Sequence, residues 1–404
     1  MQNLKTLLII SLLLFGGVKV WSQNKTASVS SEIPYFTYGK GLGIQSPDSL
    51  FLLNIRFRIQ NRVGVFTNSH SDFSSNDIEA RIRRLRLRFD GFVYNPKFTY
   101  VIQLSFSRGD WDYEAFGFPN VIRDAMIFYA INKKLTVGMG QTKLPGNRQR
   151  VISSGDQQFP DRSIVNAYFN IDRDFGVQIY YNDKIGKQFN YVLRGAVSSG
   201  EGRNFNETDN GLSYTGRIEF LPLGLFKNGG DYFESDLERE PKPKLSIGLT
   251  ANYNARATRA GGQLGEPLYE ARDFTTYQAD MIFKYRGFSI LTEFMQRNTD
   301  NPITVNDTGA VSVVKVGNGL NFQCSYLFKN NHEIALRYST VNPYTTVLDY
   351  ERSISHYALG WSKYLRGHRV KIQSDLIYQN ANINNRLNSG VNNWQMRFQV
   401  EVGI

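Results

Sequence analysis

From Phe51 onward, hydrophobic and polar residues alternate along the chain. In the first such segment Phe51, Leu53 and Ile55 fall on one face, while Arg56 and Arg58 fall on the other. Successive side chains of an extended strand point to opposite faces, so a period of two predicts a strand with one apolar and one polar face. The alternation recurs in segment after segment as far as the end of the sequence.

Sixteen segments carry this alternation and are predicted to be strands. Their predicted ranges are 51–66, 79–94, 97–108, 123–131, 135–143, 173–182, 188–199, 212–222, 244–258, 273–286, 287–298, 313–329, 332–342, 351–365, 368–380 and 392–404. The last segment alternates without a break up to Ile404. Such a strand suits closure of a sheet against its first strand.

The connections between the predicted strands are of two kinds. Those after the even-numbered strands are mostly very short, as at Asn95-Pro96 and Arg286-Gly287, whereas those after the odd-numbered strands are longer and rich in Gly, Asn, Asp and Ser. Short turns at one rim, long loops at the other and an even strand number are typical of an outer-membrane barrel. The predicted fold is all-β, a 16-stranded antiparallel transmembrane β-barrel over residues 49–404. A secreted β-sandwich is the soluble alternative, because its strands also alternate.

Three segments depart from the pattern. Arg81, Arg83 and Arg84 change phase within the second predicted strand, which indicates a bulge or a later start. Residues 225–243 form a long connection at the rim of short turns, with the Gly, Pro and charged residues of a loop. Residues 23–48 have no useful period and are predicted to be a loosely ordered lead-in.

Residues 1–22 have the features of a secretory signal peptide. Lys5 supplies a positive charge, Leu7 to Val18 is largely apolar, and Ser22 is a small residue before the predicted cleavage point. A helical membrane anchor is the alternative, but it needs roughly 20 apolar residues and Lys19 interrupts this run. We therefore expect export and localisation in the outer membrane of a Gram-negative bacterium, in contact with its lipid.

The net charge of the chain is positive and falls on export. The full sequence has 47 Lys and Arg against 36 Asp and Glu, a formal charge of +11; without Lys5 and Lys19 the charge is +9. Sixteen strands enclose a water-filled channel, so the polar face of the strands becomes a pore lining. The single cysteine, Cys324, lies on an apolar face and cannot form an internal disulfide.

The positive charge of the predicted pore lining is concentrated on the first two strands. Their polar faces supply six arginines, and Asp90 is the only local acidic residue to balance their charge. The arginines are Arg56, Arg58, Arg62, Arg84, Arg86 and Arg88. Side chains on one face of a strand recur every ~7 Å, so these guanidinium groups form a ladder that would attract small anions. The alternative is that acidic residues of loops folded inward neutralise these arginines, which then only stabilise the wall.

The segment 144–172 is the longest of the predicted loops and is third among the long ones. It contains Arg148, Arg150, Asp156, Asp161 and Arg162. It could fold into the lumen and narrow it, or remain an ordinary exposed surface loop.

Two motifs resemble the phosphate-selective porin O and P family. The first is GQTKLPGNRQRV at residues 140–151, followed by FPDRS at 159–163 and DRDFG at 172–176. The second, at residues 226–245, resembles a segment common in the Bacteroidetes-type branch and covers the anomalous connection. The resemblance implies a 16-stranded porin, usually a homotrimer, whose third long loop folds inward and whose basic residues line an anion path. The positions carried over are Lys143, Arg148, Arg150, Arg162 and Arg173.

Other function classes find little support. The four histidines have no metal-ligand spacing, and neither a GxSxG motif nor a Gly-rich phosphate loop stands out, so we expect no enzyme, no cofactor and no metal. The arginines alternate with apolar residues on strands, which is not a nucleic-acid surface. The predicted function is passive diffusion of small anions, such as phosphate or polyphosphate. A weakly selective general porin and a non-conducting structural or adhesive barrel are the alternatives.

Overall fold

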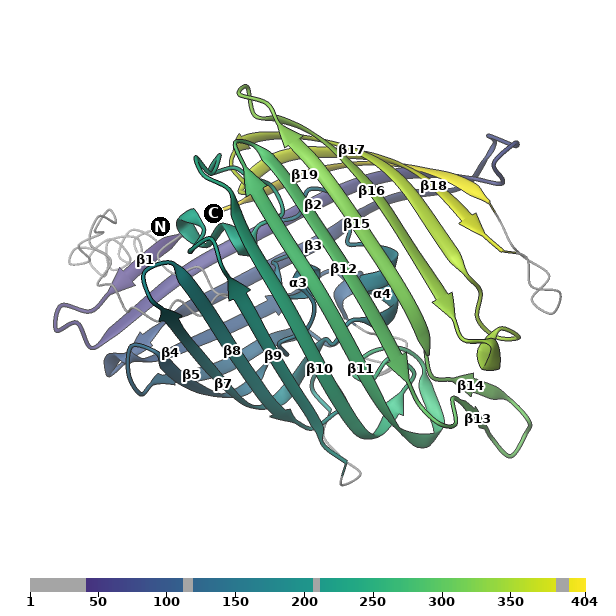
Figure 1. Cartoon of the computed structure of the whole chain (residues 1–404), viewed down its shortest axis with the longest axis horizontal. Helices are drawn as coiled ribbons and strands as arrows, with labels where there is room; N and C mark the ends of the chain where they lie inside the picture. Colours follow the sequence, from purple (N-terminus) through teal and green to yellow (C-terminus); the bar gives the residue numbers. More distant parts are fainter. Residues whose placement is uncertain (1–40, 112–118, 206–210, 383–391) are drawn as a thin grey trace, which may run out of the picture.

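The strands form one antiparallel barrel that closes on itself (Figure 1). A computed structural model describes residues 41–111, 119–205, 211–382 and 392–404. The predicted signal peptide, residues 1–22, and most of the predicted lead-in lie outside these ranges. Within them, the large sheet has 17 strands, which are the short strand β1 and the sixteen strands of the barrel.

The strands agree with the sixteen predicted ranges to within a few residues at most ends. The barrel consists of β2 (Phe51–Thr67), β3 (Ser75–Val93), β4 (Asn95–Ser105), β5 (Ile122–Ala130), β6 (Leu135–Lys143), β7 (Arg173–Ile185), β8 (Phe189–Ser198), β9 (Ser213–Leu221), β10 (Lys244–Arg259), β11 (Pro267–Tyr285), β12 (Phe288–Asn298), β15 (Gly317–Leu327), β16 (His332–Pro343), β17 (Ile354–Arg366), β18 (Val370–Ala381) and β19 (Asn393–Gly403). The predicted 16-stranded antiparallel barrel is confirmed.

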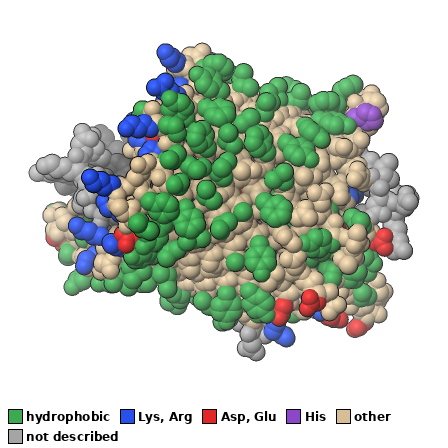
Figure 2. Space-filling model, in the orientation of Figure 1, with side chains coloured by type: hydrophobic (Ala, Val, Ile, Leu, Met, Phe, Trp, Pro, Cys, Tyr) green, Lys and Arg blue, Asp and Glu red, His purple; other side chains and the backbone are tan. Residues whose placement is uncertain are grey.

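The alternation places apolar side chains outside and polar ones inside. On β16, Leu336 is 55% exposed whereas its neighbour Arg337 is 3% exposed. Figure 2 shows the result: hydrophobic side chains cover the wall of the barrel, and charged side chains gather towards its two ends. A closed sheet with an apolar outer band leaves no unpaired backbone groups facing lipid, which is the requirement for strands that cross a membrane.

Two short strands depart from the prediction at the loop rim. Residues 303–313, between β12 and β15, contain the hairpin β13 (Ile303–Val305) and β14 (Val311–Val313). The predicted strand 313–329 therefore begins only at Gly317. The apolar residues Val314 and Val316 continue the alternation in sequence, but they pack against Ala257 and Phe274 instead of pairing in the barrel.

The barrel closes between its first and last strands, and β1 (Leu42–Gln45) extends that seam. β19 pairs with β2 from Gln395↔Phe66 to Gly403↔Arg58, as the terminal alternation predicts. β1 then pairs with the preceding part of β2, from Leu42↔Ile55 to Gln45↔Leu52. Part of the predicted loosely ordered lead-in is thus a strand, because β2 is longer than β19 and leaves backbone groups that β1 can pair.

The helical segments are short and belong to the connections. They are α3 (Arg148–Val151), α4 (Ile164–Phe169) and the 3-10 turns η1 (Arg108–Asp110), η2 (Lys227–Tyr232) and η3 (Thr345–Val347). In the described ranges, none of the helices is long and apolar enough to span a membrane. Both α3 and α4 lie in the segment 144–172, and most residues of that segment are buried.

Candidate functional site

The segment 144–172, hereafter the inner loop, crosses the lumen and is held by inward side chains of opposite walls. From β2, Arg58 donates to the hydroxyls of Ser153 and Ser154 at 3.2 and 3.0 Å. From β18, on the same side of the barrel, the Nζ of Lys371 donates to the carbonyls of Gly155 and Gln157, both at 2.8 Å. From β12, across the lumen, the carboxylate of Glu293 accepts a hydrogen bond from the Nδ2 of Asn147 at 2.9 Å. Because strands on several sides of the barrel supply these contacts, the loop divides the lumen.

The inner loop also packs into gaps left by glycine. An added Cβ on Gly360 of β17 would lie 2.6 Å from the ring of Phe159, so this ring occupies the space of a missing side chain. The guanidinium of Arg337 lies over the same ring, 4.2 Å from its centroid, and donates to the carbonyl of Asp161 at 2.9 Å. The backbone around Asp161 is therefore fixed from the β16–β17 wall.

Replacing Gly360 with valine is expected to displace Phe159 and lower barrel stability by about 1–3 kcal/mol, because an added side chain overfills a packed contact. The measurement is the temperature at which the folded band converts to the unfolded band in a gel-mobility assay. Gly195→Val is the matched control, since a Cβ on Gly195 meets no atom within 4 Å. Equal transition temperatures for the two variants would contradict this packing.

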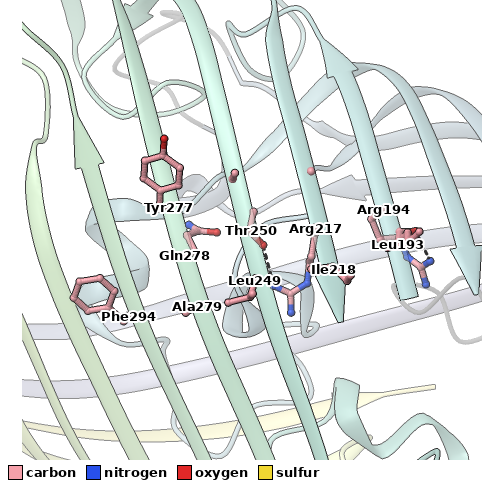
Figure 3. Close-up of a pocket in the computed structure, with 12 residues that line it drawn as sticks. Leu193, Arg194, Arg217, Ile218, Leu249, Thr250, Tyr277, Gln278, Ala279 and Phe294 are labelled. Carbon is pink, nitrogen blue, oxygen red and sulfur yellow. Dashed lines mark hydrogen bonds between the residues drawn. The ribbon is translucent and has the colours of Figure 1, made fainter. Parts of the chain in front are cut away.

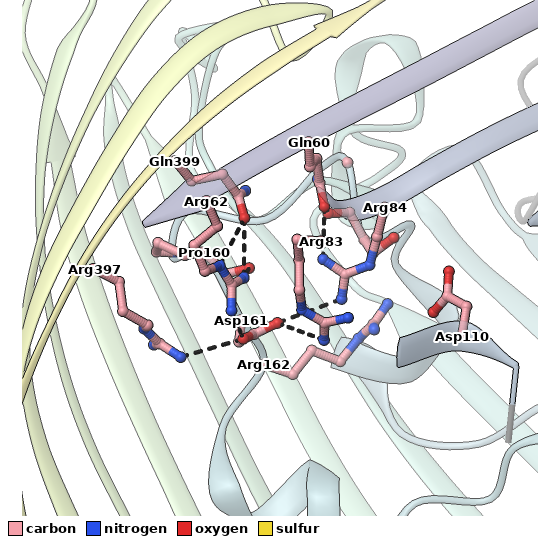
Figure 4. Close-up of polar contacts among 12 residues, drawn as sticks. Gln60, Arg62, Arg83, Arg84, Asp110, Pro160, Asp161, Arg162, Arg397 and Gln399 are labelled. Carbon is pink, nitrogen blue, oxygen red and sulfur yellow. Dashed lines mark hydrogen bonds and ion pairs between the residues drawn. The ribbon is translucent and has the colours of Figure 1, made fainter. Parts of the chain in front are cut away.

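A cluster of guanidinium groups surrounds the carboxylate of Asp161, at the tip of the inner loop (Figure 4). Its oxygens lie 2.5 Å from Arg62, 3.0 Å from Arg83 and 3.4 Å from Arg84. Arg397 of β19 approaches from the other side at 3.2 Å. One carboxylate thus bridges arginines of β2, β3 and β19, across the seam of the barrel.

Burial disfavours the ionised form of Asp161, but the nearby positive charges of Arg83, Arg62 and Arg397 outweigh it and hold the pKa of this carboxyl well below its usual value. Burial also lowers the pKa of the neighbouring Arg162 guanidinium, to about 10. Both side chains are consequently charged at neutral pH, and Asp161 is a permanent negative charge within a positive wall.

The other predicted ladder arginines also have carboxylate partners. Asp90 pairs with both Arg56 and Arg88, and Arg88 lies at 3.1 Å. Asp110 of η1 pairs with Arg86 at 2.6 Å and with a further arginine, Arg123, at 3.2 Å. Asp90 is the local partner expected from the sequence, and connections distant in sequence bring Asp110 and Asp161 to the wall in addition. Arg58, finally, lies 3.8 Å from Glu401 of β19.

Guanidinium groups nevertheless outnumber carboxylates on this wall. Asp161, Asp110 and Asp90 together contact eight of them: Arg62, Arg83, Arg84, Arg397, Arg86, Arg123, Arg56 and Arg88. Glu79 and Asp375 add contacts to Arg62 and Arg397 at 3.7 and 2.5 Å. Arg58 and its partner Glu401 bring the totals to nine guanidinium groups and six carboxylates, so this surface, hereafter the arginine wall, has an excess of positive charge.

Two β-bulges supply arginines that the ladder prediction missed. The register of β2 with β3 shifts between Gln60↔Arg84 and Asn61↔Ile82, so Arg83 is an additional residue. On β5 the register shifts in the same way and leaves Arg123 as the additional residue. A bulge lets consecutive residues face one side. The phase change at 81–84 is thus confirmed as a bulge, and the adjacent charges at 123–124 are the same signal.

A second basic cluster lies where the inner loop leaves and re-enters the barrel. Lys143 donates to the carbonyls of Val151 and Ile152 at 3.0 and 3.2 Å, and Arg162 also donates to that of Ile152, at 2.9 Å. Arg150 and Arg173 both pair with Asp172. Arg173 pairs in addition with Asp124 of β5, at 3.0 Å. We call Lys143, Arg150, Arg162 and Arg173 the loop-base cluster.

Arg148 lies apart from the other predicted site residues. It projects from α3 towards β9–β11, where its guanidinium lies 3.1 Å from both Glu219 and Asp280. Its side chain is fully buried, whereas Arg58, Arg83 and Arg88 keep 16–17% of their side-chain area exposed. The structure thus brings the predicted arginines to the arginine wall and the loop-base cluster, and leaves Arg148 in a closed network.

The sequence profile of the phosphate-selective porin O and P family matches residues 53–401. The match covers every strand of the barrel and the whole inner loop. The chain belongs to the phosphate-selective porin O and P family. It is accordingly an outer-membrane porin, a channel protein, and the expected resemblance to this family is confirmed.

Several solved structures are similar to this porin in fold but share little sequence identity with it. DcaP of Acinetobacter baumannii has a TM-score of 0.54 at 11% identity, over 90% of this chain and 99% of its own. OmpF of Salmonella typhi has a TM-score of 0.51 at 12% identity, over 89% and 100%. OmpT of Vibrio cholerae, in its trimer form, has a TM-score of 0.50 at 8% identity, over 88% and 99%. No curated protein sequence matches the chain significantly. These structures support the barrel fold.

The porin also has a hollow on its outer face, of about 570 Å³, between β8 and β12 (Figure 3). Its walls include Leu249, Tyr277 and Phe294, outward side chains that are 45–51% exposed. Gly216 and Ala251 leave the space between them. Leu249, Tyr277 and Phe294 face away from the charged lumen, and no lining residue belongs to the arginine wall.

Proposed function

We propose that this porin passes small anions, with phosphate and polyphosphate as the preferred class, by passive diffusion along the arginine wall and the loop-base cluster. The path residues are Arg56, Arg58, Arg62, Arg83, Arg84, Arg86, Arg88, Lys143, Arg150, Arg162 and Arg173. Arg148 serves the path indirectly, because it anchors α3 and thereby the inner loop.

The observation that carries the proposal is the excess of positive charge beside the inner loop. In the loop-base cluster, Lys143 and Arg162 donate to backbone carbonyls, and within the described residues no carboxylate lies within ion-pair distance of either. A charge that is removed from water without a counter-charge is costly. A passing anion would supply the missing counter-charge, and the site would therefore attract it.

The chemistry of the side chains favours phosphate-like anions. A guanidinium group is planar, stays protonated at any physiological pH and can hold two oxygens of one phosphate. Existing carboxylate partners weaken each individual site, which allows release. A series of weak sites is what conduction requires, since an ion must leave as readily as it enters.

Two further features belong to the proposal. Residues 1–22 direct export to the outer membrane as a signal peptide, and the mature chain assembles as a homotrimer. The trimer form of the structurally similar OmpT supports the second feature, and the charge pattern of residues 1–22 supports the first.

A weakly selective general porin is the second candidate. It is favoured by the observation that each of the six predicted ladder arginines has a carboxylate within 4.0 Å, with Arg58–Glu401 the longest contact at 3.8 Å. If these pairs cancelled the wall's field entirely, size alone would determine which solutes pass.

Single-channel recording in a potassium chloride gradient separates the candidates. We expect the reversal potential to lie close to the equilibrium potential of chloride. We also expect added phosphate to reduce the chloride current, because both anions use the same sites. A reversal potential near zero with no effect of phosphate would favour the general porin. Preference for potassium would contradict the proposal, and absence of any current would favour a plugged structural barrel.

A further inference from the structure

The connection between β9 and β10 lies at the rim of short turns, yet many of its residues are buried. Phe226 is 5% exposed, Asp231 6%, and Glu234, Ser235 and Asp236 are each 1% exposed. Charged residues of an exposed turn would remain in water. Residues 225–243, hereafter the rim insert, therefore fold into the barrel from the end opposite the long loops.

Inward side chains of β11 and β12 hold the rim insert. The Nζ of Lys284 donates to the carbonyls of Gly230, Phe233 and Ser235 at 2.6, 2.8 and 2.7 Å. Ser289 donates to the carbonyl of Glu234 at 2.7 Å. One buried ammonium group that satisfies three carbonyls fixes the course of the insert against this wall.

The rim insert also contacts the inner loop, and Glu234 is the main junction. Its carboxylate accepts hydrogen bonds from the Nε2 of Gln149 at 3.1 Å and from the backbone N–H of Gln158 at 2.9 Å. Its own N–H donates to the carbonyl of Asp156 at 3.0 Å. Asp231 lies 3.8 Å from Arg148 of α3. The two elements, which enter the lumen from opposite ends, thus support each other.

The exposure of the inward side chains follows the position of these two elements. Arg217 on β9 and Lys371 on β18 have fully buried side chains, as does Arg148, which contacts the insert at Asp231. On the arginine wall, Arg58 and Arg83 each keep 17% exposed. Among these basic side chains, the ones that keep access to solvent therefore lie on β2 and β3, away from Lys284 and Ser289, which hold the insert.

We propose that the rim insert is a second constriction element, which closes the lumen beside β9–β12 and β15–β16 and confines the solute path to the arginine wall. This inference rests on the proposed function for the identity of the solute, but not for the size of the path. Without the insert the barrel would keep a wide passage remote from the arginines, and ions would bypass them.

The test is to replace residues 225–243 with a short Gly-Asn-Gly linker and to record single channels, after a heat-modified gel shift shows that the barrel is folded. We expect conductance to rise about twofold or more, because a 16-stranded barrel is wide enough for an aqueous channel once its filling is removed. We also expect anion preference to fall towards that of free diffusion. Unchanged conductance in the folded variant would overturn the inference.

Lys284→Met is the second variant and decides the question should the shortened chain fail to fold. Methionine keeps much of the length of lysine but donates to none of the three carbonyls, so the insert should loosen and the current should fluctuate between the native level and a higher one. Lys363→Met is its matched control, because Lys363 donates to the carbonyl of Asn330 at an exposed position on the same rim. Identical steady currents in both lysine variants would count against the inference.

The two proposals fail in different ways. An intact channel that prefers no anion would refute the proposed function, whereas a rise in conductance on removing the insert would still support its role as a constriction. An anion-selective channel whose conductance is the same with and without the rim insert would refute only the inference.

Discussion

Replacing Arg58, Arg83 and Arg88 together with glutamine is expected to reduce the anion-over-cation permeability ratio by about tenfold, the order by which a charged cleft concentrates counter-ions. These arginines keep the most exposed side chains of the wall, at 16–17%. They are also the ones that a passing anion would meet. The measurement is the reversal potential of single channels in a salt gradient, before and after the replacement.

The triple variant should fold, because each carboxylate involved keeps another basic partner. Asp90 retains Arg56, Asp161 retains Arg62, and Glu401 retains Lys371 at 3.5 Å. Arg81→Gln is the matched control, since Arg81 is on the same strand but 52% exposed and paired with Glu79. If the control altered selectivity as much as the triple variant, the general charge of the protein would be responsible and not the wall.

Replacing Arg148 with methionine is expected to destabilise the folded porin by about 3–5 kcal/mol, because it leaves buried carboxylates short of a counter-charge. Glu219 and Asp280 would then share Arg217 alone, and the hydrogen bond from Arg148 to Ser246 at 2.9 Å would be lost. Since α3 carries Arg148, the inner loop should detach from the β9–β11 wall. The expected result is a lower unfolding temperature in the gel-mobility assay, with unstable single-channel current.

Lys227→Met is the comparison for this variant. Lys227 pairs with Glu238 at 3.2 Å, but its side chain is 60% exposed. An exposed pair of this kind contributes about 0–1 kcal/mol, so the unfolding temperature should hardly change. An Arg148→Met porin as stable as this control would mean that Arg217 alone compensates both carboxylates and that the inner loop is held elsewhere.

The barrel could be predicted from the sequence because alternation is a local property of each strand. Leu336 and Arg337 are adjacent, yet one faces out and the other in, and a closed sheet is needed to satisfy such faces. The rim of short turns could also be predicted, because the lengths of the connections between strands can be read from the sequence. Even the bulge at Arg83 appeared as a change of phase among neighbouring arginines.

The charge balance of the lumen could not be predicted, because it depends on contacts between distant residues. Arg397 and Asp161 are 236 positions apart in sequence and 3.2 Å apart in space. Nothing in the local pattern of Asp161 or Asp110 distinguishes them from acids of an exposed loop. The rim insert presents the same difficulty: its Gly, Pro and charged residues suit a surface turn, and only Lys284 and Glu234 reveal its place inside.

The seam of the barrel has a consequence for its assembly. Two separate segments share one edge of β2, since β19 covers it from Arg58 to Phe66 and β1 from Leu52 to Ile55. An uncovered strand edge is a template for pairing with another chain. β1 therefore covers the part of that edge that β19 does not pair with. A porin that lacked residues 42–45 would expose unpaired backbone groups of β2 at its rim. A strand of a second barrel could then pair with this edge.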